Sequence, residues 1–461
     1  MKALKYFTFE FVLNRMLKDY FQYYQRLLKL AFPLVLTQAG QMIVQLVDNA
    51  MVGRVGTVEL AAASFANSIF IVIMVFGLGI FLGITPLIGH ALGAKNDLSV
   101  ASTIKNGLVL SIFLIAILTL ITWSLSWWMH LMGQPEEVWR MAIPYFRTLA
   151  ISLIPFLLFM LFKQIGEGMG NTLLAMIATI LSNVLNVILN YLLIFGKFGF
   201  PELGLLGAGY ATLISRIAMP VFIFIGFMSA KKVKHYFNLI PQVQVSLKET
   251  LKIIAVGLPI AIQLLVEVSM FALGAIMMGW MGDVPLAAHQ IALGMASFTF
   301  MIANGVAMAT TIRVSYQLGL KAYSSMEKVS LSAVHLVLAY MFLCGVGFLV
   351  LRNQLPRIFT FDELVIKQAA SLIVVAALFQ LFDGLQVVCL GILRGFADVK
   401  VPMIIAGIAY LLIGLPVSYI FAFTLKMGPE GIWYGFVAGL ASAGILLFFR
   451  IRKKIKDVET M

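Results

Sequence analysis

Long apolar runs separated by short polar stretches make up most of the chain. Crossing the hydrocarbon core of a bilayer takes about 20 mostly apolar residues in a helix. An open sheet would leave backbone groups unpaired in lipid, so every run is expected to be helical. The pattern predicts twelve transmembrane helices, at residues 28–52, 60–88, 105–128, 142–163, 172–195, 205–228, 252–280, 287–312, 330–351, 367–392, 401–424 and 431–450.

Composition supports an all-α integral membrane protein. The chain is 61% hydrophobic and 11% charged, with a mean hydropathy of +1.00, whereas soluble domains are about 25% charged. The net charge of +13 does not indicate nucleic-acid binding, because Lys and Arg lie almost wholly between the apolar runs, as in cytoplasmic loops. The two cysteines, Cys344 and Cys389, fall inside apolar runs, which argues against a disulfide framework.

The distribution of charge predicts how the chain is oriented. Residues 1–27 lack the smooth apolar core and cleavage site of a secretory signal, and their aromatic and basic residues predict an arm lying on the membrane surface. This arm and the basic stretches at 229–237 and 449–456 fall on one side, opposite acidic or mixed loops. Both termini are therefore expected in the cytoplasm, in a plasma (inner) membrane. Nothing demands an oligomer, and a monomer is expected.

The two halves of the chain repeat each other. With a shift of 226 residues, Pro33 falls on Pro259 and Gly53 on Gly279, and "HALGAK" aligns with "YQLGLK". Each half holds six spans, and an even number gives both halves the same orientation. The sequence thus predicts two parallel six-helix repeats, an arrangement in which substrate binds between halves that alternate access.

The repeat also predicts how the chain is divided. The expected parts are the arm (1–27), an N-terminal lobe (28–228), a basic cytoplasmic linker (229–251), a C-terminal lobe (252–450) and a basic cytoplasmic tail (451–461).

Three carboxylates lie clearly within the apolar spans: Asp48, Glu267 and Asp383. A charge at mid-membrane costs about 2.5–3.5 kcal/mol on insertion scales. No Lys or Arg lies in the middle of those three spans, and burial without a partner disfavours the ionised form. Each carboxyl could therefore exchange a proton or bind a cation, which predicts ion coupling. The alternative is a protonated carboxyl that is merely hydrogen-bonded between helices.

Depth separates the three carboxylates. At 1.5 Å per residue, Glu267 lies about 20 Å from the outer end of its helix and Asp383 about 25 Å from its own, so these two could face one another. Asp48, in the other half, lies only about 8 Å from its outer end. Gln41, the residue aligned with Glu267, lies seven positions before Asp48 and hence on the same helical face.

The expected neighbours of Asp48 are three asparagines on the fifth span. Asn183, Asn186 and Asn190 recur at spacings of three and four, so they form one polar stripe. Such amides often hold membrane helices together by hydrogen bonds of about 0.6–2 kcal/mol. Three in one stripe favour a lined cavity over packing alone.

Other candidate motifs carry little weight. "GEGMGN" at 166–171 has no strand before it and is interpreted as a cytoplasmic turn, not a phosphate loop. The histidines are scattered without ligand spacing, so no metal site is expected. No Ser/His/Asp grouping indicates an enzyme, and no cofactor is expected beyond a coupling ion, Na⁺ or H⁺.

The chain resembles the multidrug and toxic compound extrusion (MATE) transporters, specifically the NorM-like branch. The resemblance covers residues 28–450 and rests on "PLVLTQ" and "LVDNAMVGRVG" around Asp48, "VEVSMFALGAIMMGWMG" around Glu267 and "FDGLQVVCLGILRGFADVK" around Asp383. It implies efflux of cationic, amphipathic drugs and dyes driven by Na⁺ or H⁺. It also implies a cation site at Glu267 and Asp383.

The chain departs from related patterns at three positions. The sister DinF-like branch has an acid where this chain has Asn190, and usually lacks the acid found here as Glu267; both differences favour the NorM-like branch. A second cation site, made of Asp48, Asn186, Asn190 and Thr212, would then hold one carboxylate instead of two. Some NorM-like members also carry a Tyr one turn before the tenth-span acid, where this chain has a phenylalanine at 379.

Three functions compete at this point. The leading hypothesis is a secondary antiporter in which a cation neutralises Glu267 and Asp383 and shifts the equilibrium between two packings of the lobes. The alternative is a lipid-linked precursor flippase, which would need deep cationic side chains, and only Arg216 lies well inside a span. A membrane-embedded acyltransferase would need a His or Asp constellation that the sequence lacks.

Overall fold

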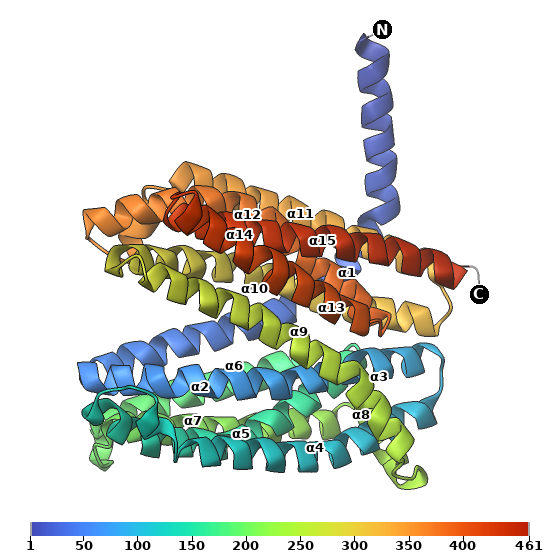
Figure 1. The fold of residues 1–461 in the computed structure, drawn as a ribbon. Helices are drawn as coiled ribbons and strands as arrows, with labels where there is room; N and C mark the ends of the chain where they lie inside the picture. Colours follow the sequence, from blue (N-terminus) through green and yellow to red (C-terminus); the bar gives the residue numbers. More distant parts are fainter. Residues whose placement is uncertain (1, 460–461) are drawn as a thin grey trace. The chain divides into compact units, whose positions relative to one another are not determined.

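Every regular element of the computed structural model is a helix within the described residues, 2–459; side chains are described for residues 20–458. The helices are α1 (Lys2–Gly53), α2 (Thr57–Leu82), α3 (Ile84–Gly93), α4 (Asp97–Leu125), α5 (Glu136–Gly168), α6 (Leu173–Phe195), α7 (Gly204–Ser229), α8 (Lys231–Leu239), α9 (Leu247–Gly279), α10 (Asp283–Gly319), α11 (Tyr323–Leu351), α12 (Glu363–Gly395), α13 (Lys400–Gly407), α14 (Leu415–Tyr419) and α15 (Pro429–Glu459) (Figure 1). Short 3₁₀ turns lie at Met129–Leu131, Lys197–Gly199, Ile240–Gln242 and Leu355–Ile358.

The twelve predicted spans are confirmed, since the described residues form twelve helices long and apolar enough to cross a membrane. α2 and α3 make one span (57–93), and α13 and α14 make another (400–424), together with two stretches of wider helical turns, Ile408–Gly414 and Ile420–Thr424. Several helices run beyond the predicted ends because polar residues at the interface continue the helix. The predicted interfacial arm falls mostly on residues 1–19, whose side chains lie outside the described ones.

The chain forms two compact units. Unit 1 consists of residues 1–35 and 266–461, and unit 2 consists of residues 36–265. The boundaries therefore fall inside α1 and α9, whereas the division predicted from the sequence follows the linker at 229–251. Each unit takes a length of helix from the opposite half of the sequence.

The repeat is visible in the backbone. Lys95 and Lys321, 226 positions apart, both adopt the left-handed conformation, with φ of 54° and 57°, just after the ends of α3 and α10. In both turns the next residue's N–H donates to the carbonyl five residues earlier, at 3.0 Å. This bond satisfies a carbonyl that the helix end leaves free. Two segments with different sequences thus end their helices in the same way.

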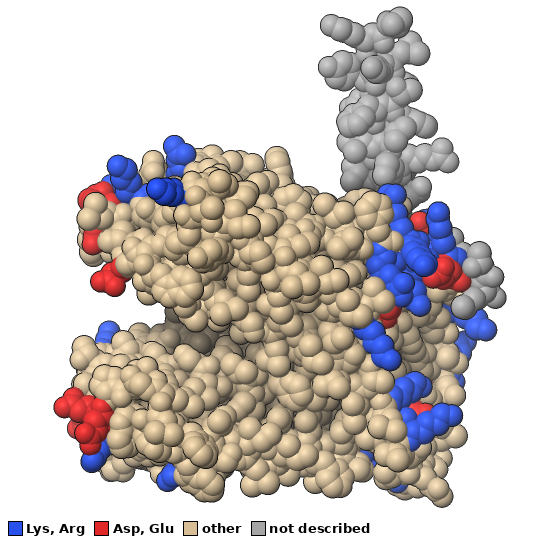
Figure 2. Space-filling view, viewed as in Figure 1, with Lys and Arg blue, Asp and Glu red and all other residues tan. Residues whose placement is uncertain are grey.

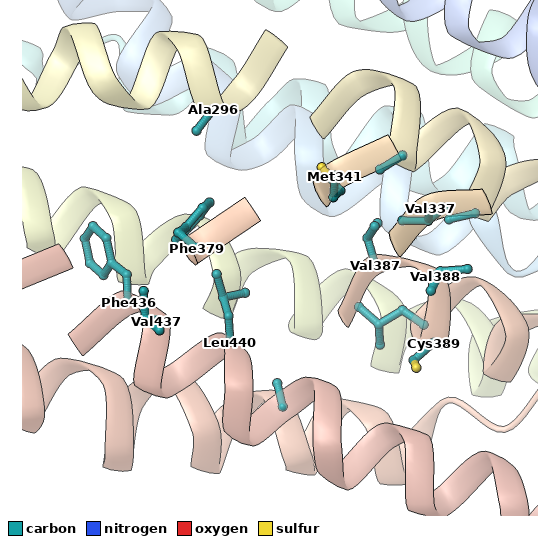
Figure 3. Close-up of a cluster of buried hydrophobic side chains, with 14 of the residues drawn as sticks. Ala296, Val337, Met341, Phe379, Val387, Val388, Cys389, Phe436, Val437 and Leu440 are labelled. Atoms are coloured by element: carbon teal, nitrogen blue, oxygen red, sulfur yellow. The ribbon is translucent and has the colours of Figure 1, made fainter. Parts of the chain in front are cut away.

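Unit 1 packs around α12. Figure 3 shows Ala296 of α10, Met341 of α11 and Phe436 of α15 in one buried cluster with Phe379 and Val387 of α12. α12 and α10 approach closely at Gly391, because any side chain at this position would meet the backbone of α10. Close packing on several sides fixes the face of α12 that carries Asp383.

In unit 2, the linker at 229–251 is hydrogen-bonded to the transmembrane helix α4. The Lys105 ammonium, on α4, donates to the Val243 carbonyl at 2.6 Å, and the Asn106 side-chain oxygen accepts from the Ser246 N–H at 2.9 Å. The linker predicted at 229–251 is therefore anchored on α4 at its second half. Figure 2 shows charged side chains at helix ends and an uncharged surface between them, as a membrane-spanning protein requires.

Candidate functional site

Unit 2 contains a cavity of about 320 Å³, lined by α1, α2, α5, α6 and α7. Two of its lining side chains are charged, Asp48 and Arg216, and the others are polar amides and hydroxyls or apolar groups. A cleft with a few convergent polar groups on apolar walls is the usual form of a small-molecule site.

One predicted neighbour, Asn190, contacts Asp48 directly, and a second, Asn186, is linked to it through Asn190. The Asn190 amide donates to the Asp48 carboxylate and also to the Asn186 side-chain oxygen, at 3.0 Å. Asn186 donates in turn to the Ser215 hydroxyl at 3.3 Å, and Ser215 donates to the Thr212 carbonyl at 3.0 Å. The spacing of four on α6 and of three on α7 produces this chain of polar groups.

The remaining predicted members of this group line the same cavity. Asn183, Thr212 and Gln41 all face it. Two buried atoms of the asparagine stripe lack hydrogen-bond partners among the described residues: the Asn183 amide nitrogen and the Asn190 side-chain oxygen. Unpaired buried polar atoms are costly, and hard cations favour carboxylate and amide oxygens. The arrangement can therefore accept a cation or a polar ligand group.

Unit 1 brings Glu267 and Asp383 together. Asp383 is buried and Glu267 half-buried, and the two carboxyls lie close enough to interact electrostatically. Arg394, which follows Asp383 by three helical turns on the same face of α12, interacts with Glu267. Like charges about 4 Å apart repel by about 4 kcal/mol at an effective dielectric constant of 20, so a bound cation or proton would relieve this pair.

Sequence reasoning missed two members of the unit 1 cluster. The Tyr410 hydroxyl lies beside the Gln386 amide and near both carboxyls. Neither Tyr410 nor Gln386 makes a well-formed side-chain hydrogen bond among the described residues, although both are buried. Tyr410 lies in the wide turns of Ile408–Gly414, and such turns often occur at functional sites.

Position 379 has a structural role. Phe379 packs edge-on against Phe271 and Trp433, with ring centroids 6.3 and 5.4 Å apart. A phenol group near Asp383 is supplied instead by Tyr410, from another span.

The folded chain brings two arginines near the carboxylates, although none lies in the middle of the three spans that carry them. Arg216, on α7, interacts electrostatically with Asp48, and Arg394 interacts with Glu267. Each arginine lies on a different helix from the carboxylate with which it interacts, so inspection of single spans could not reveal either one.

The interpretation of "GEGMGN" as a turn was partly wrong. α5 continues to Gly168, and Glu167 is a buried carboxylate within the spans, in addition to the three predicted ones. Its side-chain oxygen lies 3.8 Å from the ammonium of Lys163, one turn earlier, which offsets its charge. Among the described residues, no group of three or more His, Cys, Asp or Glu could hold a metal ion.

The chain matches the sequence profile of the MatE family twice, at residues 33–192 and at residues 259–420. The two matches begin 226 residues apart, as the repeat predicts.

The chain is similar to a probable multidrug resistance protein NorM from Mannheimia succiniciproducens, with 35% identity over 94% of each chain. It is also similar to the multidrug resistance protein MdtK of Edwardsiella ictaluri, with 31% identity over 95% of this chain and 96% of the relative.

Solved structures share the fold. The eukaryotic MATE transporter AtDTX14 superimposes with a TM-score of 0.84 over 95% of this chain and 98% of its own, at 20% identity. An outward-facing multidrug resistance MATE family transporter of the MOP superfamily gives 0.85 over 95% and 96%, at 22% identity.

Proposed function

Because the chain belongs to the multidrug and toxic compound extrusion family of membrane transporters, we propose that it is a multidrug efflux antiporter. It exports cationic, amphipathic drugs and dyes in exchange for Na⁺ or H⁺. The observation that carries this proposal is the pair of interacting carboxyls in unit 1, half-buried Glu267 and buried Asp383, set among polar groups with unused hydrogen-bonding capacity. The family contains transporters, which agrees with the prediction that the chain is not an enzyme.

The coupling ion binds at Glu267 and Asp383. A cation between the two carboxyls removes their mutual repulsion, and the Tyr410 hydroxyl is placed to add a further oxygen ligand. Binding drives alternating access only if the ion prefers one packing of the two halves over the other. A proton could replace a metal cation at the same carboxyls, so this chemistry is compatible with either ion.

The drug binds in the unit 2 cavity. Asp48 supplies a negative charge for a cationic substrate, and Asn186, Asn190 and Thr212 supply polar contacts around it. Phe70 and other apolar lining residues cover the hydrophobic part of the molecule. Asp48 also remains a candidate for a second cation or proton site.

We propose that the protein lies in the plasma (inner) membrane with both termini in the cytoplasm and acts as a monomer. The basic stretches at 231–234 and 450–456 support this orientation, because cytoplasmic loops carry an excess of Lys and Arg.

Dye efflux tests the proposal. Cells that lack their main efflux pumps are loaded with a fluorescent lipophilic cation and express either the wild type, Glu267→Gln or Glu202→Gln. Glu202 is an exposed residue outside the cluster and serves as the matched control. Dye loss is followed after a Na⁺ pulse at fixed pH and after an acid pulse without Na⁺.

Loss triggered by one ion, absent in Glu267→Gln and retained in Glu202→Gln, would establish the antiporter and name its ion. No loss under either pulse would contradict multidrug efflux and favour the lipid-linked precursor flippase, for which the half-buried Arg216 and Arg394 would supply cationic side chains.

A further inference from the structure

We propose that a cavity at one end of unit 1 binds an anionic phospholipid, with the lipid phosphate at Arg452 and Lys453 and the acyl chains on an apolar wall. The cavity has a volume of about 700 Å³ and is formed by α11, α12 and α15, which is large enough for a small-molecule site. Neither Glu267 nor Asp383 lines it. The lipid site is therefore separate from the carboxyls proposed for the coupling ion.

The α15 side of the cavity has an apolar part and a cationic part. Phe448 and Phe449 lie further from the C-terminal end of the helix than Arg452, Lys453 and Lys456. At 1.5 Å per residue, these residues extend over about 12 Å of α15. The cations lie toward the end of the span, where lipid headgroups are found, and the rings lie toward the hydrocarbon.

The α11 side of the cavity has the same order of groups. Glu327 and Ser330 lie nearer to the start of the helix than Leu331 and Val334. Three cations against the single carboxylate of Glu327 give the lining a net positive charge. An amphipathic anion that lies along the two helices matches both this charge and the order of polar and apolar groups, whereas a free phosphate would leave the apolar part uncovered.

Arg452 and Lys453 have no anionic partner in the part of the chain whose side chains are described. Neither belongs to a direct ion pair there. The guanidinium of Arg452 lies over the ring of Phe448, with its Cζ atom 4.9 Å from the ring centroid. Stacking of this kind covers the face of the guanidinium and leaves the N–H groups along its edge for a phosphate.

A neighbouring arginine outside the cavity behaves differently. Arg450, two residues before Arg452, does not line the cavity, and its Nε donates to the Asp398 carboxylate at 2.7 Å. The basic residue that has a structural role on this helix is thus paired within the protein, and the two in the cavity remain available to a ligand.

The position of the cavity also fits a lipid. The proposed orientation places the C-terminal end of α15 on the cytoplasmic side, and Figure 2 shows Lys and Arg side chains gathered near this end of the helix. Basic pockets between membrane helices on the cytoplasmic side are typical sites for anionic lipid headgroups, and the cytoplasmic leaflet contains anionic lipids.

Two lipids with the same acyl chains test the proposal. Phosphatidylglycerol has a net negative headgroup, whereas phosphatidylcholine balances the same phosphate with a cation. The purified full-length protein in detergent is mixed with equal amounts of both, and the bound lipids are counted by native mass spectrometry. The test variant is Arg452→Gln with Lys453→Gln. The matched control is Lys400→Gln with Lys454→Gln, which removes two charges at the same end of unit 1 but outside the cavity.

The wild type should retain phosphatidylglycerol in preference to phosphatidylcholine. Loss of both cavity cations should lower this preference by about 30-fold, or about fivefold for each charge, and the control should keep the preference of the wild type. Glycerol 3-phosphate, which has the phosphate without acyl chains, should not displace the bound lipid.

Equal retention of the two lipids by the wild type would overturn the proposal, and so would an unchanged preference in the test variant. An equal loss of preference in the control would show general attraction to surface charge instead of a site. Displacement by glycerol 3-phosphate would show a site for phosphate alone, and a dimer that forms without lipid would make a second copy of the chain the occupant. The ratio of the two lipids within one variant corrects for partial misfolding.

Discussion

The buried ion pair of α5 allows a prediction whose size follows from the structure. The Lys163 and Glu167 side chains are 4% and 2% exposed, and their charged atoms are 3.8 Å apart. Lys163→Met removes the cation and leaves the carboxyl buried without its countercharge. Breaking a buried pair from one side costs about 3–5 kcal/mol. At about 2–4 °C per kcal/mol for a domain of 150–250 residues, the midpoint of thermal unfolding should fall by about 6–20 °C.

The double variant Lys163→Met with Glu167→Leu gives the opposite expectation. Replacing both charges by apolar side chains removes the desolvation penalty along with the attraction, so stability should return to within about 1–2 kcal/mol of the wild type. The assay is thermal unfolding of the purified protein in detergent, followed by intrinsic fluorescence. A single variant as stable as the wild type, or a double variant as unstable as the single one, would refute this reasoning.

A surface ion pair serves as the control. Arg140 and Glu136 also lie one turn apart on α5 and are closer together, but their side chains are 67% and 65% exposed. Water already solvates both charges, so Arg140→Met should cost less than about 1 kcal/mol. Burial, and not the distance between the charges, then decides which pair matters.

Three further predictions concern unit 2 and the helix ends. Asn190→Leu leaves the Asp48 carboxylate without its amide donor. It should therefore destabilise the protein by about 1–3 kcal/mol and abolish dye efflux. Unchanged efflux would contradict the proposed role of the cavity. Lys321→Gly should raise stability by about 1 kcal/mol, because the residue adopts a left-handed conformation that glycine tolerates at less cost; a lower unfolding temperature would contradict this. Gly257→Ala would force a Cβ into the backbone of α2 and should lower the unfolding temperature. Gly347→Ala places its Cβ in open space and should leave the unfolding temperature unchanged. Equal effects of the two substitutions would rule out close packing as the reason for a glycine at position 257.

The sequence predicts well the twelve helices and the polar group of Asp48, Asn186 and Asn190. An apolar run of about 20 residues can satisfy its backbone hydrogen bonds in lipid only as a helix, so all twelve spans were predicted. The observed helices extend past the predicted ends where polar residues continue them. Asn186 and Asn190 do share one face of α6, with Asn190 in contact with Asp48, because helical periodicity fixes the relative direction of the two side chains.

Partners contributed by other helices could not be predicted in this way. Periodicity determines the face of a helix on which a residue lies, but not which helix packs against that face. Arg216 and Tyr410 belong to spans that the sequence does not connect with their carboxylate neighbours. Tyr410 also lies in turns wider than the α-helix, so a spacing of 3.6 residues gives the wrong direction for its side chain. Glu167 was missed because a charge near the end of an apolar run normally lies in water.

The exchange of helix segments between the units has a consequence for how the protein can be assembled from fragments. A chain cut in the linker at 229–251 gives a first fragment that carries residues 1–35 of unit 1 and a second that carries the last helical turns of unit 2, up to Leu265. Neither fragment alone contains all the residues of either unit. Fragments made separately should therefore be degraded, whereas fragments made together from split genes should complement each other and restore a working protein.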